Sequence, residues 1–209
     1  MSPDSRTPTA PARRPGSRAA RRLRLVPLPA LALTIGLLGC QSAAPRLSKD
    51  SVLVATPIEP QAGPSECGLA CLTALLGAWD MTLDDAGRAR FAPERLEREG
   101  GVQAGELRDY LRDRGLRAAL VRGRFDAEPP TGLFALLDRG LPLIVRLQLD
   151  TDGGPRSHFV LVNGYDPEKR WILIMDPDRG AIGGITYERF RETWQAGGHL
   201  LLVAAPERA

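Results

Sequence analysis

The sequence predicts an α+β fold, with N-terminal helices packed on a C-terminal antiparallel sheet. Between residues 67 and 140, apolar residues mostly recur every three or four positions, which is the spacing of amphipathic helices. After residue 140, apolar residues form short runs separated by clusters of Gly, Pro and Asp, which is typical of strands joined by turns. Helices first and strands second is the order of an α+β domain.

Each expected helix has a recognisable beginning or end. The first starts at Cys67, directly after Ser65 and Glu66, which suit the cap and first turn. The helix over 103–116 has apolar leucines on one face and Gly115 as its stop. The expected helices span residues 67–78, 82–91, 103–116, 131–140 and 186–194.

The strands are expected where apolar runs lie between turn residues. The runs over 141–149, 157–165 and 170–176 are joined by "DTDGGPR" and "DPEKR", so they should pair as antiparallel neighbours. A short entry strand is expected within 51–60, where prolines close an alternating pattern. Further strands are expected over 117–122 and 199–206.

The first forty residues resemble the export signal of a bacterial lipoprotein. Residues 1–24 are polar and basic, and the apolar stretch that follows is too short to favour a membrane span. It ends in "LLGC", which resembles the lipobox, in which the peptide before the cysteine is cut and the cysteine is acylated. The resemblance implies a lipoprotein signal peptide over 1–39 and lipidation of Cys40. An ordinary signal peptide or an anchor helix is the alternative.

The residues after Cys40 indicate where the mature protein would be found. Gln41, rather than Asp, favours sorting to the outer membrane in a Gram-negative cell, so we expect a lipid-anchored protein of the cell envelope at the periplasmic face of that membrane. The Arg21-Arg22 pair also raises twin-arginine export, although the residues after it match that signal poorly. Residues 40–52 read as the lipidated cysteine and a polar tether, and residues 53–209 as the folded domain.

Removal of the signal peptide reverses the net charge. The whole chain has 28 basic and 25 acidic residues, a net charge of +3. Residues 1–39 contain seven Arg and one Asp, so the mature part has 21 basic and 24 acidic residues, a net charge of −3. The basic excess therefore does not indicate nucleic-acid binding. The sequence contains no phosphate-binding loop, and it implies no metal or organic cofactor.

Cys67 is the candidate nucleophile. A cysteine in the first turn of a helix lies at the positive end of the helix dipole, where the thiolate is favoured over the thiol. Cys71, one turn further along, is expected in the core. The alternatives for Cys67 are a buried structural residue, a strained disulfide with Cys71, or a metal site that lacks the usual zinc spacing.

A nucleophilic cysteine needs a base and a group that orients the base. His158 opens a strand and Asp176 closes the next one, so antiparallel pairing would bring them side by side. Gln61, six residues before Cys67, could donate an amide N–H to a developing oxyanion. A core histidine and a turn cap are the alternatives for His158 and Asp176. His199 has no motif around it and is expected on the surface.

These residues carry a family resemblance. "QAGPSECGLAC", followed by "HFVLVNGYD" and "MDPDRG", resembles the papain-like cysteine peptidases that remove double-glycine leaders from bacteriocins. The resemblance covers about residues 55–204. It implies Cys67 as nucleophile, His158 as base, Asp176 as the residue that orients the base, and Gln61 as part of the oxyanion hole.

The resemblance has limits that leave other functions open. Glu66 stands where the family commonly has Asp, and the chain has neither the spans nor the nucleotide-binding motif of the exporter that this domain usually heads. We expect a membrane-anchored cysteine peptidase that acts on a peptide or protein substrate, with Gly-Gly in a leader as one cleavage site to consider. An acyltransferase or transpeptidase with the same residues, or a peptide-binding module of an export or surface-assembly system, are the alternatives.

Overall fold

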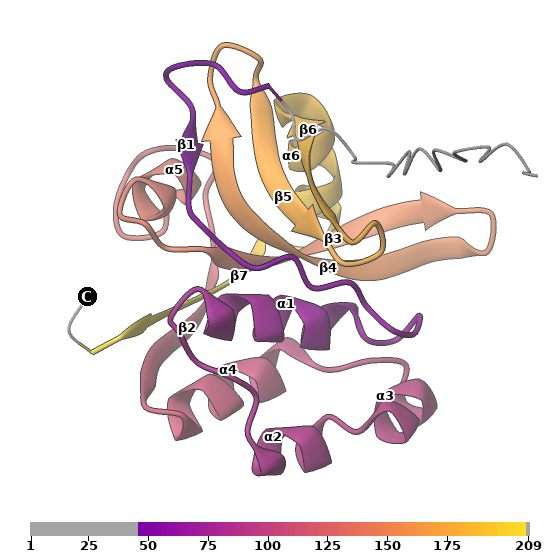
Figure 1. Ribbon diagram of the computed structural model, residues 1–209. Helices are drawn as coiled ribbons and strands as arrows, with labels where there is room; N and C mark the ends of the chain where they lie inside the picture. Colours follow the sequence, from indigo (N-terminus) through magenta and orange to yellow (C-terminus); the bar gives the residue numbers. More distant parts are fainter. Residues whose placement is uncertain (1–45, 208–209) are drawn as a thin grey trace, which may run out of the picture. The chain divides into compact units, whose positions relative to one another are not determined.

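Long apolar strands pair antiparallel to form a seven-stranded sheet, which confirms the α+β class. The computed structural model describes residues 46–207, so the expected signal peptide 1–39 and Cys40 lie outside the described residues. The strand order is β2-β7-β3-β4-β5-β6, and β1 pairs with β4 (Figure 1). The strands are β1 Val52–Leu53, β2 Leu116–Arg122, β3 Leu143–Thr151, β4 Gly154–Asp166, β5 Trp171–Asp176, β6 Ala181–Thr186 and β7 Leu200–Pro206.

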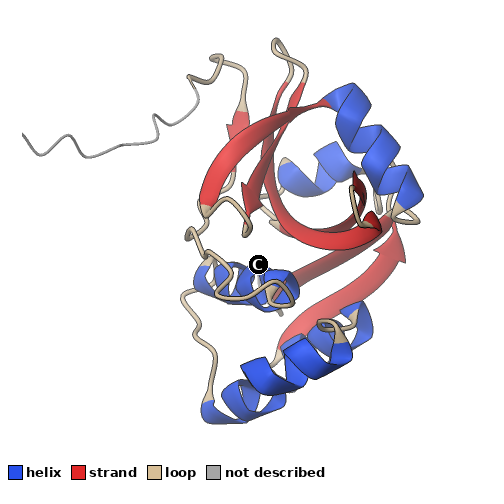
Figure 2. Ribbon diagram, turned by 90° about the vertical axis from the view of Figure 1, so that its right-hand side faces the viewer, coloured by secondary structure: helices blue, strands red, loops and turns tan. Residues whose placement is uncertain are grey.

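Helices cover the sheet on both faces. α1 and α4 pack on one face, mainly against β4 and β2, whereas α5 and α6 pack on the other face (Figures 1 and 2). The order of elements along the chain did not indicate this second layer. Within residues 46–207, none of the helices combines the length and apolar character needed to cross a bilayer. The helices are α1 Cys67–Gly77, α2 Asp85–Arg90, α3 Pro93–Glu99, α4 Ala104–Asp113, α5 Leu133–Leu137 and α6 Tyr187–Ala196.

Two elements were not predicted from the sequence. α3 begins at Pro93, which suits a first helical turn, and stops at Gly100, which has a left-handed φ of 72°. β6 contains Gly183 and Gly184, and glycines weaken a strand pattern. Gly184 leaves room for a ring, because a Cβ there would lie 2.5 Å from the indole of Trp171.

The hairpin of β3 and β4 is longer than the sequence indicated. A turn cluster was expected over 150–156, but pairing continues to Thr151 and Gly154, so only Asp152 and Gly153 form the turn. By contrast, β1 covers two residues of the strand expected within 51–60. The pairing that holds β3 and β4 together fixes the backbone around His158.

The two faces of β4 belong to two separate hydrophobic cores, because successive side chains of a strand alternate. Phe159 and Leu161 face α1 and α4. Val160 and Val162 face α5 and α6, where Trp194 is also buried. Full burial of one such aliphatic side chain contributes roughly 1.5–3 kcal/mol, so a one-residue slip of β4 would be costly.

The segment before β1 is tied to the end of β4. Asp166 has no exposed surface, and its carboxylate accepts hydrogen bonds from the backbone N–H and the hydroxyl of Ser48, both at 2.8 Å. It also accepts from the N–H of Lys169 at 3.0 Å. These donors satisfy a buried charge that would otherwise be unfavourable. Residues near the end of the expected tether 40–52 therefore contact the domain directly.

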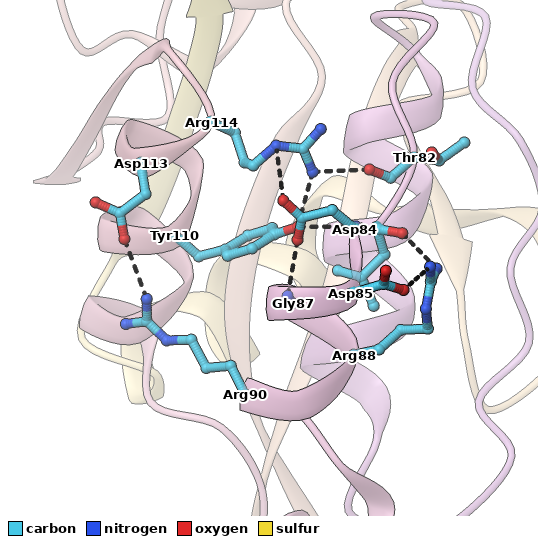
Figure 3. A network of polar contacts seen from close by, with 10 residues as sticks. Thr82, Asp84, Asp85, Gly87, Arg88, Arg90, Tyr110, Asp113 and Arg114 are labelled. Atoms are coloured by element: carbon cyan, nitrogen blue, oxygen red, sulfur yellow. Dashed lines mark hydrogen bonds and ion pairs between the residues drawn. The ribbon is translucent and has the colours of Figure 1, made fainter.

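A polar network joins α2 to the end of α4 (Figure 3). Asp84 caps α2 by accepting a hydrogen bond from the N–H of Gly87 at 2.7 Å, and it also accepts from the hydroxyl of Tyr110 at 2.9 Å. Arg114 donates to that hydroxyl and to the carbonyl of Thr82, both at 2.8 Å. Because Tyr110 is only 3% exposed, its hydroxyl anchors this network to the core.

Candidate active site

Cys67 is the first residue of α1, as the sequence predicted. Glu66 takes the N-cap position without a side-chain capping hydrogen bond, so its carboxylate does not occupy the N–H groups of the first turn. A Cβ on Gly68 would lie 2.3 Å from Val102 and 3.1 Å from Phe159. The Cys-Gly pair therefore allows the start of α1 to approach β4 closely.

His158 and Asp176 lie side by side on neighbouring antiparallel strands. β4 pairs with β5 through Leu161 and Met175, and Asp176 is the last residue of β5. Nε2 of His158 lies 2.8 Å from Oδ1 of Asp176, and His158 is only 2% exposed. This hydrogen bond occupies Nε2 and leaves Nδ1 as the ring nitrogen available to a thiol.

The imidazole of His158 lies near enough to the thiol of Cys67 to lower its pKa. Burial alone raises the pKa of this thiol, but His158 and the backbone N–H groups of Phe159 and Gly68 outweigh burial, and the pKa of Cys67 lies below its ordinary value. Burial raises the pKa of Cys71 well above its ordinary value. Of these two thiols, Cys67 is the one prepared to ionise.

The charges of His158 and Asp176 complement the thiolate. Burial lowers the pKa of His158, but the contacts with Asp176 and Cys67 raise it to about 9. Burial raises the pKa of Asp176, but the hydrogen bonds from His158 and from the N–H of Asp178 hold it below its usual value. The directions of the three shifts therefore favour the pairing of a thiolate with an imidazolium beside a carboxylate.

Gln61 is tied to the loop that follows β5. Its backbone N–H donates to the carbonyl of Pro177 at 3.0 Å, and its side-chain Nε2 donates to Oδ1 of Asp178 at 3.1 Å. Its Oε1 is buried and has no hydrogen-bond partner among residues 46–207. The structure therefore brings Gln61 to the loop after Asp176, and in the described part of the chain no hydrogen bond joins it to Cys67.

Two polar side chains of the site were not singled out from the sequence. Nη2 of Arg156 lies 3.5 Å from Nδ1 of His158 and 3.5 Å from Oδ2 of Asp178. Arg156 is two residues before His158 on β4, and the strand period places both on one face. Asp178 is two residues after Asp176 in "MDPD". These spacings are the signals that could have pointed to them.

Two cavities border the candidate catalytic residues. A cavity of about 390 Å³ is lined by His158 and Asp176, by apolar side chains of β3 to β5, by β6, and by Arg179 and Arg189. A second cavity of about 190 Å³ is lined by Cys67, the loop before α4, Arg146 and Arg156. The first therefore offers a mainly apolar surface beside the imidazole, and the second includes two arginine residues together with Cys67 in its lining.

The remaining cysteine and histidine, Cys71 and His199, pack against other side chains of the domain. Cys71 is fully buried in the core, as expected, and both Cys67 and Cys71 are free thiols. His199 is half-buried and stacks on Trp194, with ring centroids 5.3 Å apart, so the expectation of a surface residue was wrong. Among the described residues, no group of three His, Cys, Asp or Glu side chains is arranged to bind a metal ion.

A thiolate, an imidazolium that can donate a proton, and a carboxylate that orients the ring are suited to acyl chemistry through a thioester. Together with helices and an antiparallel sheet in this arrangement, they define the class of papain-like cysteine peptidases. The chain belongs to the Peptidase C39 family, whose family model matches residues 55–208. It is therefore a cysteine-type peptidase, a hydrolase.

Solved structures of similar fold are peptidase domains. A double glycine motif protease from an AMS/PCAT transporter, in complex with the leader peptide, is 20% identical, with a TM-score of 0.55 over 74% of this chain and 94% of its own. A putative C39-like peptidase from Bacillus anthracis is 17% identical, with a TM-score of 0.56 over 76% and 98%. The peptidase domain of Streptococcus ComA, a bifunctional ABC transporter of a quorum-sensing pathway, is 19% identical, with a TM-score of 0.53 over 74% and 99%. No curated protein matches the chain. At these identities the structures show a shared fold.

Proposed function

We propose that this peptidase cleaves a peptide bond through a thioester on Cys67, with His158 as the acid and base and Asp176 as the residue that orients the imidazole. The observation that carries this proposal is the 2.8 Å hydrogen bond between Asp176 and His158, on an imidazole that in turn lowers the pKa of the thiol at the start of α1. The opposite directions of the Cys67 and His158 pKa shifts support an ion pair that is ready for attack.

In the first half of the reaction, the thiolate sulfur of Cys67 forms a bond to the substrate carbonyl carbon, and the carbonyl π electrons move to oxygen. The side-chain N–H of Gln61 and the backbone N–H of Cys67 stabilise this oxyanion. The tetrahedral intermediate then collapses. The C–N bond breaks, and His158 gives its proton to the departing amine, which leaves a thioester on Cys67.

In the second half, neutral His158 removes a proton from water as the water oxygen attacks the thioester carbonyl. The C–S bond breaks on collapse, so the carboxylic acid product leaves and the thiolate and imidazolium return. The hydrogen bond between Asp176 and Nε2 keeps Nδ1 directed at the reacting atoms in both halves.

The substrate is proposed to be a peptide with a Gly-Gly cleavage site at the end of a leader. Membership of the C39 family supports this choice, as does the double glycine motif protease that shares the fold. The mainly apolar cavity beside His158 suits an apolar segment of a peptide, because such cavities bind ligands chiefly by removing apolar surface from water. An export or surface-assembly system is the proposed source of the peptide.

The protein is further proposed to act at the cell envelope. The "LLGC" pattern supports acylation of Cys40 after removal of residues 1–39, and Gln41 supports the periplasmic face of the outer membrane in a Gram-negative cell. This placement would keep the enzyme attached to the membrane while residues 53–209 form the catalytic domain.

The proposal is tested with the full-length protein in detergent and a panel of leader-like peptides. Peptides with Gly-Gly should be cut after the second Gly, and matched peptides with Ala-Ala should be cut much more slowly. Cys67→Ala should abolish cleavage, whereas Cys71→Ala, the matched control, should retain it. Cleavage by Cys67→Ala at the wild-type rate would overturn the mechanism.

The same experiment separates the alternative functions. A transpeptidase would join the released acyl group to an added amine, which mass spectrometry detects as a new peptide product. A binding module would retain peptides with equal affinity in wild type and in Cys67→Ala, and it would release no fragments. Either result would replace hydrolysis as the function of the site.

A further inference from the structure

An amide side chain assists an oxyanion only in one of its two orientations. Turned one way, Gln61 presents N–H donors, and turned the other way it presents Oε1, whose lone pairs would repel the developing negative charge. A glutamine proposed as an oxyanion donor therefore needs a neighbour that discriminates between its two ends.

The carboxylate of Asp178 can distinguish the nitrogen end of the Gln61 amide from its oxygen end. An ionised carboxylate accepts hydrogen bonds and donates none, and Oδ1 of Asp178 lies 3.1 Å from Nε2 of Gln61. Turning the amide over would place Oε1 of Gln61 against this carboxylate oxygen. One N–H of Nε2 is used by Asp178, and the second N–H of the same nitrogen remains for another acceptor. The Oε1 atom of Gln61 is buried and has no hydrogen-bond partner among the described residues. The side-chain amide is therefore held through its nitrogen atom and not through its oxygen.

The loop after β5 couples this contact to the catalytic carboxylate. The carbonyl of Pro177 accepts the backbone N–H of Gln61 at 3.0 Å. The N–H of Asp178 donates to Oδ1 of Asp176 at 3.1 Å, the same oxygen that accepts from His158. Gln61 and the His158–Asp176 pair are therefore both held by three consecutive residues, 176–178.

A carboxylate near the oxyanion would by itself oppose the negative charge that develops there. Arg156 offsets this charge, because its Nη2 lies 3.5 Å from Oδ2 of Asp178. Asp178 can therefore fix the amide without leaving an uncompensated negative charge at the site.

We propose that Asp178 is a positioning residue, which orients the amide of Gln61 so that a free N–H faces the oxyanion. This inference rests on the proposed function, in which Gln61 stabilises the oxyanion. It assigns Asp178 no contact with the substrate, so its effect on catalysis passes through Gln61.

The first test is a double-mutant cycle on a cleavable Gly-Gly peptide, with the full-length protein. Asp178→Ala should lower kcat about tenfold or more, by analogy with loss of an oxyanion donor, while KM stays within about twofold. In the Gln61→Ala background, Asp178→Ala should have no further effect, because the amide it orients is gone. Equal fold losses in both backgrounds would overturn the inference.

Controls separate positioning from folding. Asp178→Asn keeps an acceptor oxygen but can also donate, so it should fall between wild type and Asp178→Ala. Asp85→Ala removes a carboxylate paired with Arg88 on α2 and should leave kcat unchanged. All variants should keep the wild-type Tm to within about 2 °C. Loss of kcat in Asp178→Ala together with a large fall in Tm would instead assign Asp178 a structural role.

A second test needs no substrate. In nitrogen-15 NMR spectra of the full-length protein, the two side-chain amide protons of Gln61 should be well separated in wild type, and the separation should shrink in Asp178→Ala. Unchanged signals would overturn the positioning inference alone. A wild-type enzyme that cleaves no peptide would instead overturn the proposed function, whatever the amide signals show.

Discussion

Nε2 of His158 lies 2.8 Å from Oδ1 of Asp176, at the point where β5 ends beside β4. The contact occupies Nε2 of the ring, and against the lowering effect of burial it acts together with Cys67 to raise the pKa of the imidazole to about 9. A buried histidine without this partner would favour its neutral form. The carboxylate of Asp176 is therefore the group whose removal should most change the pH behaviour of the site.

Substitution of that carboxylate should move the alkaline limit of turnover. The reactive pair requires a thiolate, which forms above the lowered pKa of Cys67, and an imidazolium, which is lost as the pH rises through about 9. In Asp176→Asn the pKa of His158 should fall, so the alkaline loss of kcat should begin at lower pH, with kcat reduced about a hundredfold or more. A pH–rate profile of wild type and variant measures both effects. Asp138→Asn, at the carboxylate that binds Tyr165, is the control that should leave the profile unchanged.

The thiols of Cys67 and Cys71 should differ in reactivity. At pH 6 iodoacetamide should modify Cys67 well before Cys71, because His158 and two backbone N–H groups favour the Cys67 thiolate, whereas burial disfavours the Cys71 thiolate. Peptide mapping by mass spectrometry gives the order. Faster labelling of Cys71, or a disulfide between the two, would contradict the mechanism.

A methyl group at Gly68 should disturb the site without touching the reacting atoms. The added Cβ of Gly68→Ala would meet a methyl group of Val102 at 2.3 Å, so either Val102 or the start of α1 must shift. Such overpacking costs typically about 1–3 kcal/mol of unfolding free energy and should also slow alkylation of Cys67. Urea unfolding and alkylation rates are the measurements. Gly105→Ala, where a Cβ meets open space, is the matched control.

The polar network between α2 and α4 should contribute to the stability of the fold and not to turnover. Tyr110→Phe removes a nearly buried hydroxyl that donates to Asp84 and accepts from Arg114, so the unfolding free energy should fall by about 1–3 kcal/mol. Turnover should be unchanged, because this network lies outside both cavities. Tyr187→Phe is the comparison, since the Tyr187 hydroxyl makes no hydrogen bond among residues 46–207. A loss of turnover at full stability would contradict this assignment.

The lipid anchor is tested in cells of the source organism or a bacterial host. Wild-type protein should take up a labelled fatty acid and sediment with membranes, because "LLGC" resembles a lipobox with Cys40 as its acylated residue. Cys40→Ser should do neither. Cys71→Ser controls for acylation of an internal thiol. Equal labelling of wild type and Cys40→Ser would remove the lipoprotein proposal.

The elements that the sequence predicted well are those with uninterrupted apolar patterns. β3, β4 and β5 were expected because each contains an apolar run, most of which is buried, and α1 and α4 because their leucines repeat along one face. β6 was missed because Gly183 and Gly184 remove the side chains that reveal a strand. The placement of α5 and α6 on the second face depends on contacts between distant segments, which a pattern along the chain does not report.

For the candidate site, the sequence indicated the ends of elements and not the contacts between loops. Cys67 begins a helix and Asp176 ends a strand, so each is marked by a change of pattern. The positions of Arg156 and Asp178 show no such change of pattern. Their place in the site depends on contacts of the loop after β5 with the start of β4 and with the loop before α1. The same cause explains why Gln61 could be singled out while its hydrogen bond to Asp178 could not.

The hydrogen bonds between Ser48 and Asp166 decide from which end of the domain the chain departs toward its N-terminus. Asp166 ends β4, and His158 lies eight residues earlier on the same strand, roughly 25 Å when followed along the strand at about 3.3 Å per residue. In the proposed lipoprotein, the described part of the chain would therefore be joined to its anchor through Ser48, by the end of β4 that is remote from His158. Tethering and substrate access would then use opposite ends of one strand, so peptides could reach the cavities from the aqueous side without passing the attachment point.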